Sequence, residues 1–266
     1  MSLFHVYIRS AAHGYTMTVA FASHEVADEW WRAMSTHTET SNWIKRVSPQ
    51  LYLSTGPNPR SASQPGALYY PRKDGTSQFD DKMVYLWQSD SYTTNSRDLA
   101  SQFGGSGTRH GTLGIIPAQS TTNQTSGNSF FIRSKVEPYD YWYCPTTAGR
   151  ITEGTKVYTS REERTRFRVR IADEKMQPGA IMIGADEITI SPAFAPALRV
   201  SVENGVARAG LAAAGSESEH PKLKLSDVRT GFTSGGRVTD DENDFDIVVR
   251  ELVEALDGDG EGWELV

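Results

Sequence analysis

The chain has 266 residues, enough for one large domain or two smaller ones. Hydrophobic residues make up only 38%, which argues against a large α/β enzyme, because the buried parallel strands of such enzymes need long apolar runs. The net charge of −6 argues against a general nucleic-acid binder. We find no apolar run long enough for a membrane span and no signal peptide. We therefore expect a soluble protein, either cytoplasmic or released without a conventional signal peptide.

The N-terminal residues predict a hairpin followed by a helix. Residues 3–10 and 15–22 have the composition of strands, and Gly14 lies in the turn between them. Ser23 then occupies the position of a helix N-cap. Apolar residues recur at helical spacing over residues 24–36, which predicts an amphipathic helix.

The middle of the chain predicts short strands separated by turns. Residues 95–103 predict a short helix, and a long loop rich in Gly, Ser, Thr and Asn follows at 104–128. Asn204 and Gly205 lie between two apolar runs, which is a strong hairpin signal. Gly235 and Gly236 predict a break. Strands are predicted at 83–87, 130–133, 141–143, 156–158, 164–171, 180–183, 187–190 and 198–203.

Near the C-terminus, apolar residues recur at the spacing of one helical face and predict a second amphipathic helix. They are Phe245, Val248, Val249, Leu252, Val253 and Leu256. The whole pattern predicts a mainly-β fold of short antiparallel strands, with α+β as the alternative. A polar stretch ending in Pro-Gly predicts a boundary near residue 175. We expect residues 1–175 to hold the N-terminal hairpin and helix. Residues 176–266 are then a second domain or part of the same one.

The segment at 164–171 alternates between two kinds of side chain. Thr165, Phe167, Val169 and Ile171 share one face, and Arg164, Arg166, Arg168 and Arg170 share the other. Four neighbouring guanidinium groups repel one another unless anions balance them. Two interpretations are open. We favour balance by the acidic segment 240–264, which carries eleven Asp and Glu residues; the alternative is a bound anion.

Aromatic and polar side chains crowd a second segment, and two residues of the polar loop add to them. The candidate ligand-binding residues are Tyr139, Asp140, Tyr141, Trp142, His110 and Asn123. Carbohydrate sites combine an aromatic plane with side chains that hydrogen-bond to hydroxyl groups. This composition favours a lectin-like protein that binds a glycan or another small molecule. Ordinary packing of aromatic residues across a sheet is the alternative.

Residues 129–171 carry a family resemblance. They run from Phe131-Ile132-Arg133 through Tyr141-Trp142-Tyr143 to the arginine-rich strand. This pattern resembles one repeat of the ricin-B-like β-trefoil lectins of fungal fruiting bodies. The resemblance implies a β-trefoil fold and sugar binding without catalysis.

Two further hypotheses concern other functional classes. The tripeptide His110-Gly111-Thr112 resembles the first motif of the ADP-ribosyltransferases. That resemblance implies that His110 holds the ribose of NAD, that Tyr139 or Tyr141 stacks on nicotinamide, and that Glu187 supports transfer. The third hypothesis is an interaction protein whose charged faces serve self-assembly as a homo-oligomer.

The metal-ligating residue types indicate no metal site. The single cysteine, Cys144, excludes an internal disulfide and is interpreted as a buried apolar residue. The histidines lack the spacing of a helical zinc site. Asp257, Asp259 and Glu261 match the first half of a calcium-binding loop, but the glutamate expected at its end is missing. We expect no cofactor, with calcium at these three residues as the alternative.

Overall fold

The chain folds into two compact units, Met1–Thr121 and Thr122–Val266, called here the first and the second unit. The computed structural model describes residues 3–10, 16–38, 40–55, 72–73, 76–77, 79, 82–88, 119, 121–146, 149–173, 175–176, 179–211, 223–238, 247–255 and 260–266. The expected boundary near residue 175 falls between two strands of the second unit that pair with each other over five residues of each strand. Both sides of that position therefore belong to one unit.

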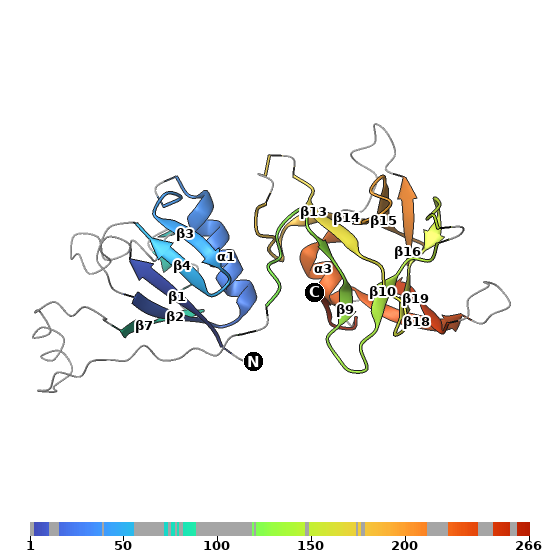
Figure 1. Cartoon of the computed structure of the whole chain (residues 1–266), viewed down its shortest axis with the longest axis horizontal. Coiled ribbons are helices and arrows are strands. Elements are labelled where there is room, and N and C mark those ends of the chain that lie inside the picture. Colours follow the sequence, from blue (N-terminus) through green and yellow to red (C-terminus); the bar gives the residue numbers. More distant parts are fainter. Residues whose placement is uncertain are drawn as a thin grey trace, which may run out of the picture. The chain divides into compact units, whose positions relative to one another are not determined.

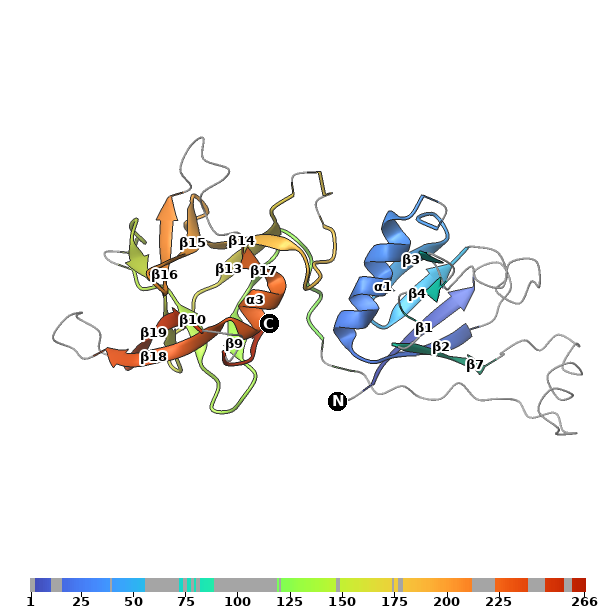
Figure 2. The ribbon, with the colours of Figure 1, turned by 180° about the vertical axis from the view of Figure 1, so that it is seen from behind.

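The first unit is a mixed sheet with a helix on one face (Figures 1 and 2). The strand order is β3-β4-β1-β2-β7, in which β1 pairs antiparallel with β2 and parallel with β4. The predicted hairpin and the predicted strand at 83–87 are confirmed. The elements are β1 (Phe4–Ser10), β2 (Thr16–Phe21), α1 (His24–Thr36), β3 (Ile44–Ser48), β4 (Leu51–Ser54), β5 (Arg72–Lys73), β6 (Thr76–Ser77) and β7 (Met83–Gln88).

Helix α1 forms where the sequence predicts it. The Ser23 side chain accepts a hydrogen bond from the backbone N–H of Val26, which satisfies a donor that the helix itself cannot pair. The helix buries Ala27, Trp30 and Met34 in the core of the first unit. That apolar face holds the helix against the sheet, because burial of each large side chain contributes about 1.5–3 kcal/mol.

The second unit is built almost entirely from antiparallel strands in two main sheets. A nine-stranded sheet follows the path β11-β16-β19-β12-β10-β9-β20, with β15 paired to β16 and β18 paired to β19. A four-stranded sheet has the order β17-β14-β13-β8. The elements are β8 (Ser129–Phe130), β9 (Ile132–Ser134), β10 (Tyr141–Tyr143), β11 (Thr155–Lys156), β12 (Tyr158–Ser160), β13 (Phe167–Ile171), β14 (Glu187–Pro192), β15 (Leu198–Glu203), β16 (Val206–Leu211), β17 (Leu223–Lys224), α3 (Leu225–Thr230), β18 (Phe232–Val238), β19 (Val249–Glu254) and β20 (Trp263–Leu265).

One hydrophobic core joins the two sheets of the second unit. At its centre Trp142 makes edge-on ring contacts with Phe167, Phe232 and Trp263, at centroid distances of 6.0, 5.1 and 6.0 Å. Such edge-to-face pairs stabilise a core beyond the area that they bury. Phe167 comes from the four-stranded sheet and Trp142 from the nine-stranded one, so this aromatic cluster fixes the two sheets together.

The predicted hairpin at Asn204 and Gly205 is confirmed. Asn204 has φ 51° and Gly205 has φ 76°, so both central residues adopt the left-handed conformation of a type I′ turn. β15 and β16 pair on either side of it in continuous register. The residue pair therefore sets the register of this hairpin, as its sequence indicates.

The prediction of a C-terminal helix is wrong, because the chain forms strand β19 there. β19 pairs with β12, β16 and β18, so neighbouring strands lie along both of its edges. Val249 and Leu252 are both buried, although three positions apart they point to opposite faces of a strand. A strand with apolar residues on both faces reproduces the spacing of a helical stripe. The β-branched Val248, Val249 and Val253 favour the strand.

Two smaller expectations also have an outcome. Gly235 and Gly236 do not end a strand; they lie inside β18, where the register with β19 shifts in a bulge between Ser234 and Arg237. The predicted helix at 95–103 lies outside the described residues.

The β-rich, antiparallel fold class is confirmed, while the β-trefoil stays a prediction. Among the described residues, no helix is long and apolar enough to cross a membrane.

Candidate functional site: an arginine face on the second unit

The predicted alternation at 164–171 is confirmed. Thr165, Phe167 and Val169 are buried, and the residues between them point outward. The outward row consists of Arg164, Arg166 and Arg170, which are exposed, and Arg168, which is half-buried. We call these four residues the arginine face. The opposite side of this segment is bonded to the neighbouring chain. There the Thr165 hydroxyl accepts a hydrogen bond from the backbone N–H of Cys144 at 2.9 Å.

Hydroxyl groups flank this row on the neighbouring strands. Arg168 lies opposite Ser191 of β14 and Ser129 of β8, and Arg170 lies opposite Thr189 of β14. Directly opposed residues of antiparallel strands share a face. These three hydroxyl side chains are half-buried and have no hydrogen-bond partner in the described part of the chain. Each hydroxyl group can both donate and accept hydrogen bonds.

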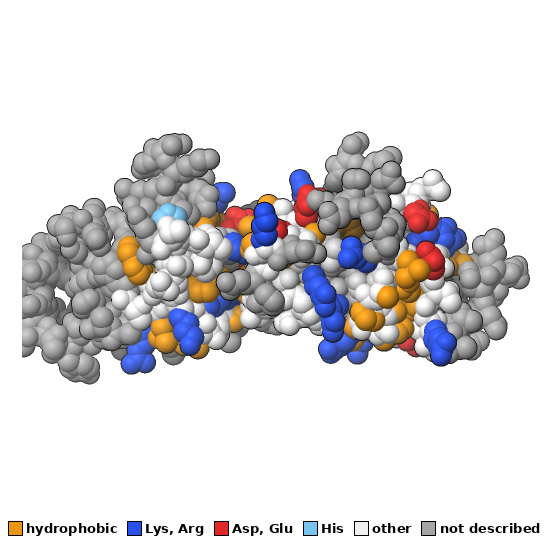
Figure 3. Space-filling model, turned by 90° about the horizontal axis from the view of Figure 1, so that it is seen from above, with side chains coloured by type: hydrophobic (Ala, Val, Ile, Leu, Met, Phe, Trp, Pro, Cys, Tyr) orange, Lys and Arg blue, Asp and Glu red, His pale blue; other side chains and the backbone are white. Residues whose placement is uncertain are grey.

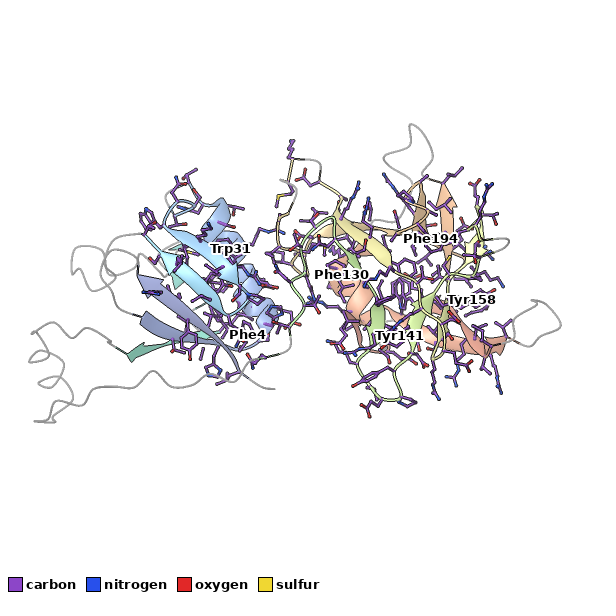
Figure 4. All side chains as sticks on the ribbon, in the orientation of Figure 1. Phe4, Trp31, Phe130, Tyr141, Tyr158 and Phe194 are labelled. Carbon is purple, nitrogen blue, oxygen red and sulfur yellow. The ribbon has the colours of Figure 1, made fainter. Side chains whose placement is uncertain are left out.

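Two of the guanidinium groups rest on an aromatic ring. The Arg164 and Arg166 guanidinium carbons lie 4.7 and 4.8 Å from the centroid of the Phe131 ring. Arg164 is also 5.5 Å from the ring of Tyr141, which meets Phe131 edge-on. Figure 4 labels Tyr141 on β10. These cation–π contacts limit the rotamers of both arginines without neutralising their charge.

No carboxylate pairs with the arginine face in the ranges that the structure describes. In addition, the Nε atom of Arg168 is buried without a hydrogen-bond partner among those residues. Figure 3 shows a group of Lys and Arg side chains on the surface of the second unit, next to hydrophobic side chains. Antiparallel sheets commonly place opposite charges across from one another. Here the residues directly opposite Arg168 and Arg170 are hydroxyl residues instead, and the acidic Glu187 lies diagonal to Arg170.

Two described acids of the C-terminal segment form ion pairs elsewhere. Glu251 forms an ion pair with Lys156, and Glu264 pairs with Arg133, whose Nε lies 3.0 Å from the carboxylate. Hydrogen bonding to Glu264 raises the pKa of Arg133, and hydrogen bonding to Glu251 raises that of Lys156. The favoured interpretation, that this segment balances the arginine face, is therefore not what the described residues show. Most of the other acids of the segment lie outside them.

The predicted aromatic residues divide between core and surface. Trp142 is fully buried, so its ring cannot stack on a sugar. Tyr139 and Tyr141 are half-buried, and the Arg133 guanidinium covers the Tyr139 ring at 4.4 Å. A hydrogen bond with Glu137 raises the pKa of Tyr139. Asp140 accepts a hydrogen bond from Arg161 Nε at 3.0 Å. The segment therefore positions arginine side chains. None of the three rings, those of Tyr139, Tyr141 and Trp142, offers an uncovered face to a sugar.

Of the other predicted residues, Glu187 shares the outward face of β14 with Thr189 and Ser191, one position beyond Arg170, and the rest lie elsewhere or outside the described ranges. Asn123 is exposed in the segment before β8, and Glu187 is exposed at the start of β14. His110 lies outside the described residues, so the hypothesis of an NAD-using enzyme stays a prediction. Asp257 and Asp259 also lie outside them, while Glu261 accepts a hydrogen bond from the Ser234 hydroxyl at 3.0 Å.

Cys144 is buried, as the sequence indicates. Burial raises the pKa of its thiol to about 12, so the thiol stays protonated near neutral pH. A protonated, buried thiol is a poor nucleophile. Metal ligands do not converge either: no group of three or more His, Cys, Asp or Glu side chains that could hold a metal ion occurs within the described ranges.

Sequence reasoning found the four arginines but missed the residues around them. Phe131, Ser129, Thr189 and Ser191 come from other strands, and only the pairing of β8 and β14 with β13 brings the three hydroxyl residues beside the row. Alternation could have identified Phe131 as a surface residue beside the row. It lies between Phe130 and Ile132, which are both buried, so its side chain points outward. No family model, curated protein or solved structure matches this chain.

Proposed function

We propose that this protein binds carbohydrates that carry acidic groups, and that the arginine face holds those groups. The observation that carries the proposal is the pair Arg164 and Arg166, whose guanidinium groups rest on Phe131 with no carboxylate partner in the described chain. Guanidinium groups bind carboxylate and sulfate oxygens through two parallel hydrogen bonds. Preorganised arginines lose less side-chain entropy when they bind.

The hydroxyl groups beside the row favour a carbohydrate over a simple anion. Ser129, Thr189 and Ser191 can each donate and accept hydrogen bonds, as sugar hydroxyl groups do. The recognition that we propose differs from stacking on an aromatic plane. The aromatic rings position the arginines, and the arginines and hydroxyl groups contact the sugar.

Isothermal titration with a sulfated disaccharide and its unsulfated analogue tests the proposal. We expect the wild type to bind only the sulfated sugar. We expect the Arg164→Ala/Arg166→Ala variant to bind it at least tenfold more weakly, because hydrogen bonds to charged groups contribute about 1.5–3 kcal/mol each.

The matched control removes the same charge from another surface. Arg199 of β15 and Arg250 of β19 are exposed on the nine-stranded sheet, so Arg199→Ala/Arg250→Ala keeps the arginine face intact. We expect this control to bind like the wild type. Equal binding of both sugars by the wild type, or equal losses in the two double variants, would show that the arginine face is not the site.

A further inference from the structure

The four arginines alternate with buried residues from Arg164 and Arg166, just before β13, to Arg168 and Arg170 within it. Alternate residues of an extended chain are about 6.4–6.8 Å apart, so seven extended residues reach at most about 20 Å. The backbone around the row is held in place by hydrogen bonds. The carbonyl oxygen of Arg166 accepts one from the N–H of Ala193 at 2.8 Å, and β13 pairs with β14 on one side and β8 on the other. The acidic group of one monosaccharide can contact only a part of such a row.

Every position of the row carries a positive charge, although the residues that surround its two ends differ. Arg164 and Arg166 rest on Phe131, whereas Arg168 lies between Ser129 of β8 and Ser191 of β14 and Arg170 lies opposite Thr189 of β14. No ion pair interrupts it within the described chain, and the buried Nε of Arg168 has no partner there. A ligand with regularly repeated acidic groups would contact every position.

We propose that the ligand is a linear acidic polysaccharide that lies along β13 and the residues just before it and contacts all four arginines. This inference rests on the proposed function and specifies the length and direction of its ligand. A single-stranded nucleic acid is also a linear polyanion, but proteins bind it largely by stacking bases on free aromatic rings. Here the Phe131 and Tyr139 rings are each covered by a guanidinium group. The flanking hydroxyl groups suit sugars.

A length series of one sulfated polysaccharide tests this inference on the full chain. Affinity is measured for the disaccharide, tetrasaccharide and hexasaccharide at several salt concentrations. We expect the hexasaccharide to bind at least tenfold more tightly than the disaccharide, with a steeper loss of affinity on added salt, because more counterions are released. The Arg168→Ala/Arg170→Ala variant is expected to bring the hexasaccharide affinity close to that of the disaccharide. The Arg199→Ala/Arg250→Ala control should keep the length dependence.

The outcomes separate the inference from the function on which it rests. If the disaccharide binds through Arg164 and Arg166 and longer chains bind no better, the inference is wrong and the proposed function stands. If no sulfated sugar binds, both are wrong. A hexathymidylate that displaces the hexasaccharide and binds more tightly would overturn the assignment to polysaccharide.

Discussion

Phe131 positions two charges that would otherwise repel each other. The guanidinium groups of Arg164 and Arg166 lie within 5 Å of its ring centroid, and an aromatic ring attracts cations to its face. The Tyr141 ring meets Phe131 edge-on and supports it. The ring thus prepares both arginines for an anion before any ligand arrives.

Replacing Phe131 with leucine is therefore expected to weaken binding without unfolding the protein. Each cation–π contact contributes about 0.5–1 kcal/mol at an exposed site, so the loss of two predicts about fivefold weaker binding or more. Titration with a sulfated oligosaccharide measures the change. Phe194→Leu, at an exposed aromatic residue of the same unit, is the control. Unchanged affinity in Phe131→Leu would show that the ring does not position the arginines.

The first unit contains a buried ion pair. Arg46 Nη1 lies 2.8 Å from Asp28 Oδ1, and the two side chains are 7% and 3% exposed. Burial also raises the pKa of the neighbouring Tyr52. Removing Arg46 leaves the buried Asp28 carboxylate with His24, whose Nε2 lies 3.6 Å from Asp28 Oδ2, and loss of a partner from a buried ion pair is costly.

We expect Arg46→Met to lower the free energy of unfolding of the first unit by about 3–5 kcal/mol. Urea unfolding followed by tryptophan fluorescence measures this loss. Lys45→Met, at the exposed neighbouring position on β3, is the control and should change stability little. A loss as small as that of the control would show that the pair does not stabilise the fold.

At the scale of elements, the C-terminal residues complete the nine-stranded sheet and pack beside α3. The N–H of Gly260 donates a hydrogen bond to the carbonyl of Thr230 at 3.0 Å. A Cβ at Gly260 would lie 2.2 Å from that oxygen and 2.6 Å from the carbonyl oxygen of Phe232. The chain can therefore pass this point only with glycine.

Gly260→Ala is expected to destabilise the second unit by about 3 kcal/mol, because backbone atoms must move to admit the methyl group. Gly236→Ala is the matched control, since a Cβ there would meet no atom within 4 Å. Thermal unfolding of both variants gives the comparison. Equal midpoints would contradict the close approach at Gly260.

How far the sequence predicts an element depends on what determines it. Local signals were sufficient for α1, with its Ser23 cap, and for the Asn204-Gly205 turn. They failed for β19, because its pairing on both edges buries residues on both faces. The arginine row was predictable from alternation alone. Its hydroxyl neighbours were not, because the pairing of β8 and β14 with β13 is non-local.

At the scale of the whole molecule, the two units have separate cores. The arginine face and the residues that flank it all belong to the second unit. A unit with its own core and its own site is expected to fold and bind alone.

We therefore expect the fragment 122–266 to fold without the first unit and to keep the oligosaccharide affinity within about twofold of the full chain. Dispersed amide signals in its NMR spectrum and titration calorimetry check both parts. A folded fragment without binding would indicate that the first unit contributes to the site. An unfolded fragment would contradict the independence of the units.

The central claim is that acidic carbohydrate binds on the arginine face, and NMR titration of the unmodified full chain tests it most directly. On adding a sulfated hexasaccharide, we predict backbone shift changes concentrated at residues 129–131, 164–170 and 189–191. Shift changes confined to other residues, or none at saturating concentration, would contradict the account.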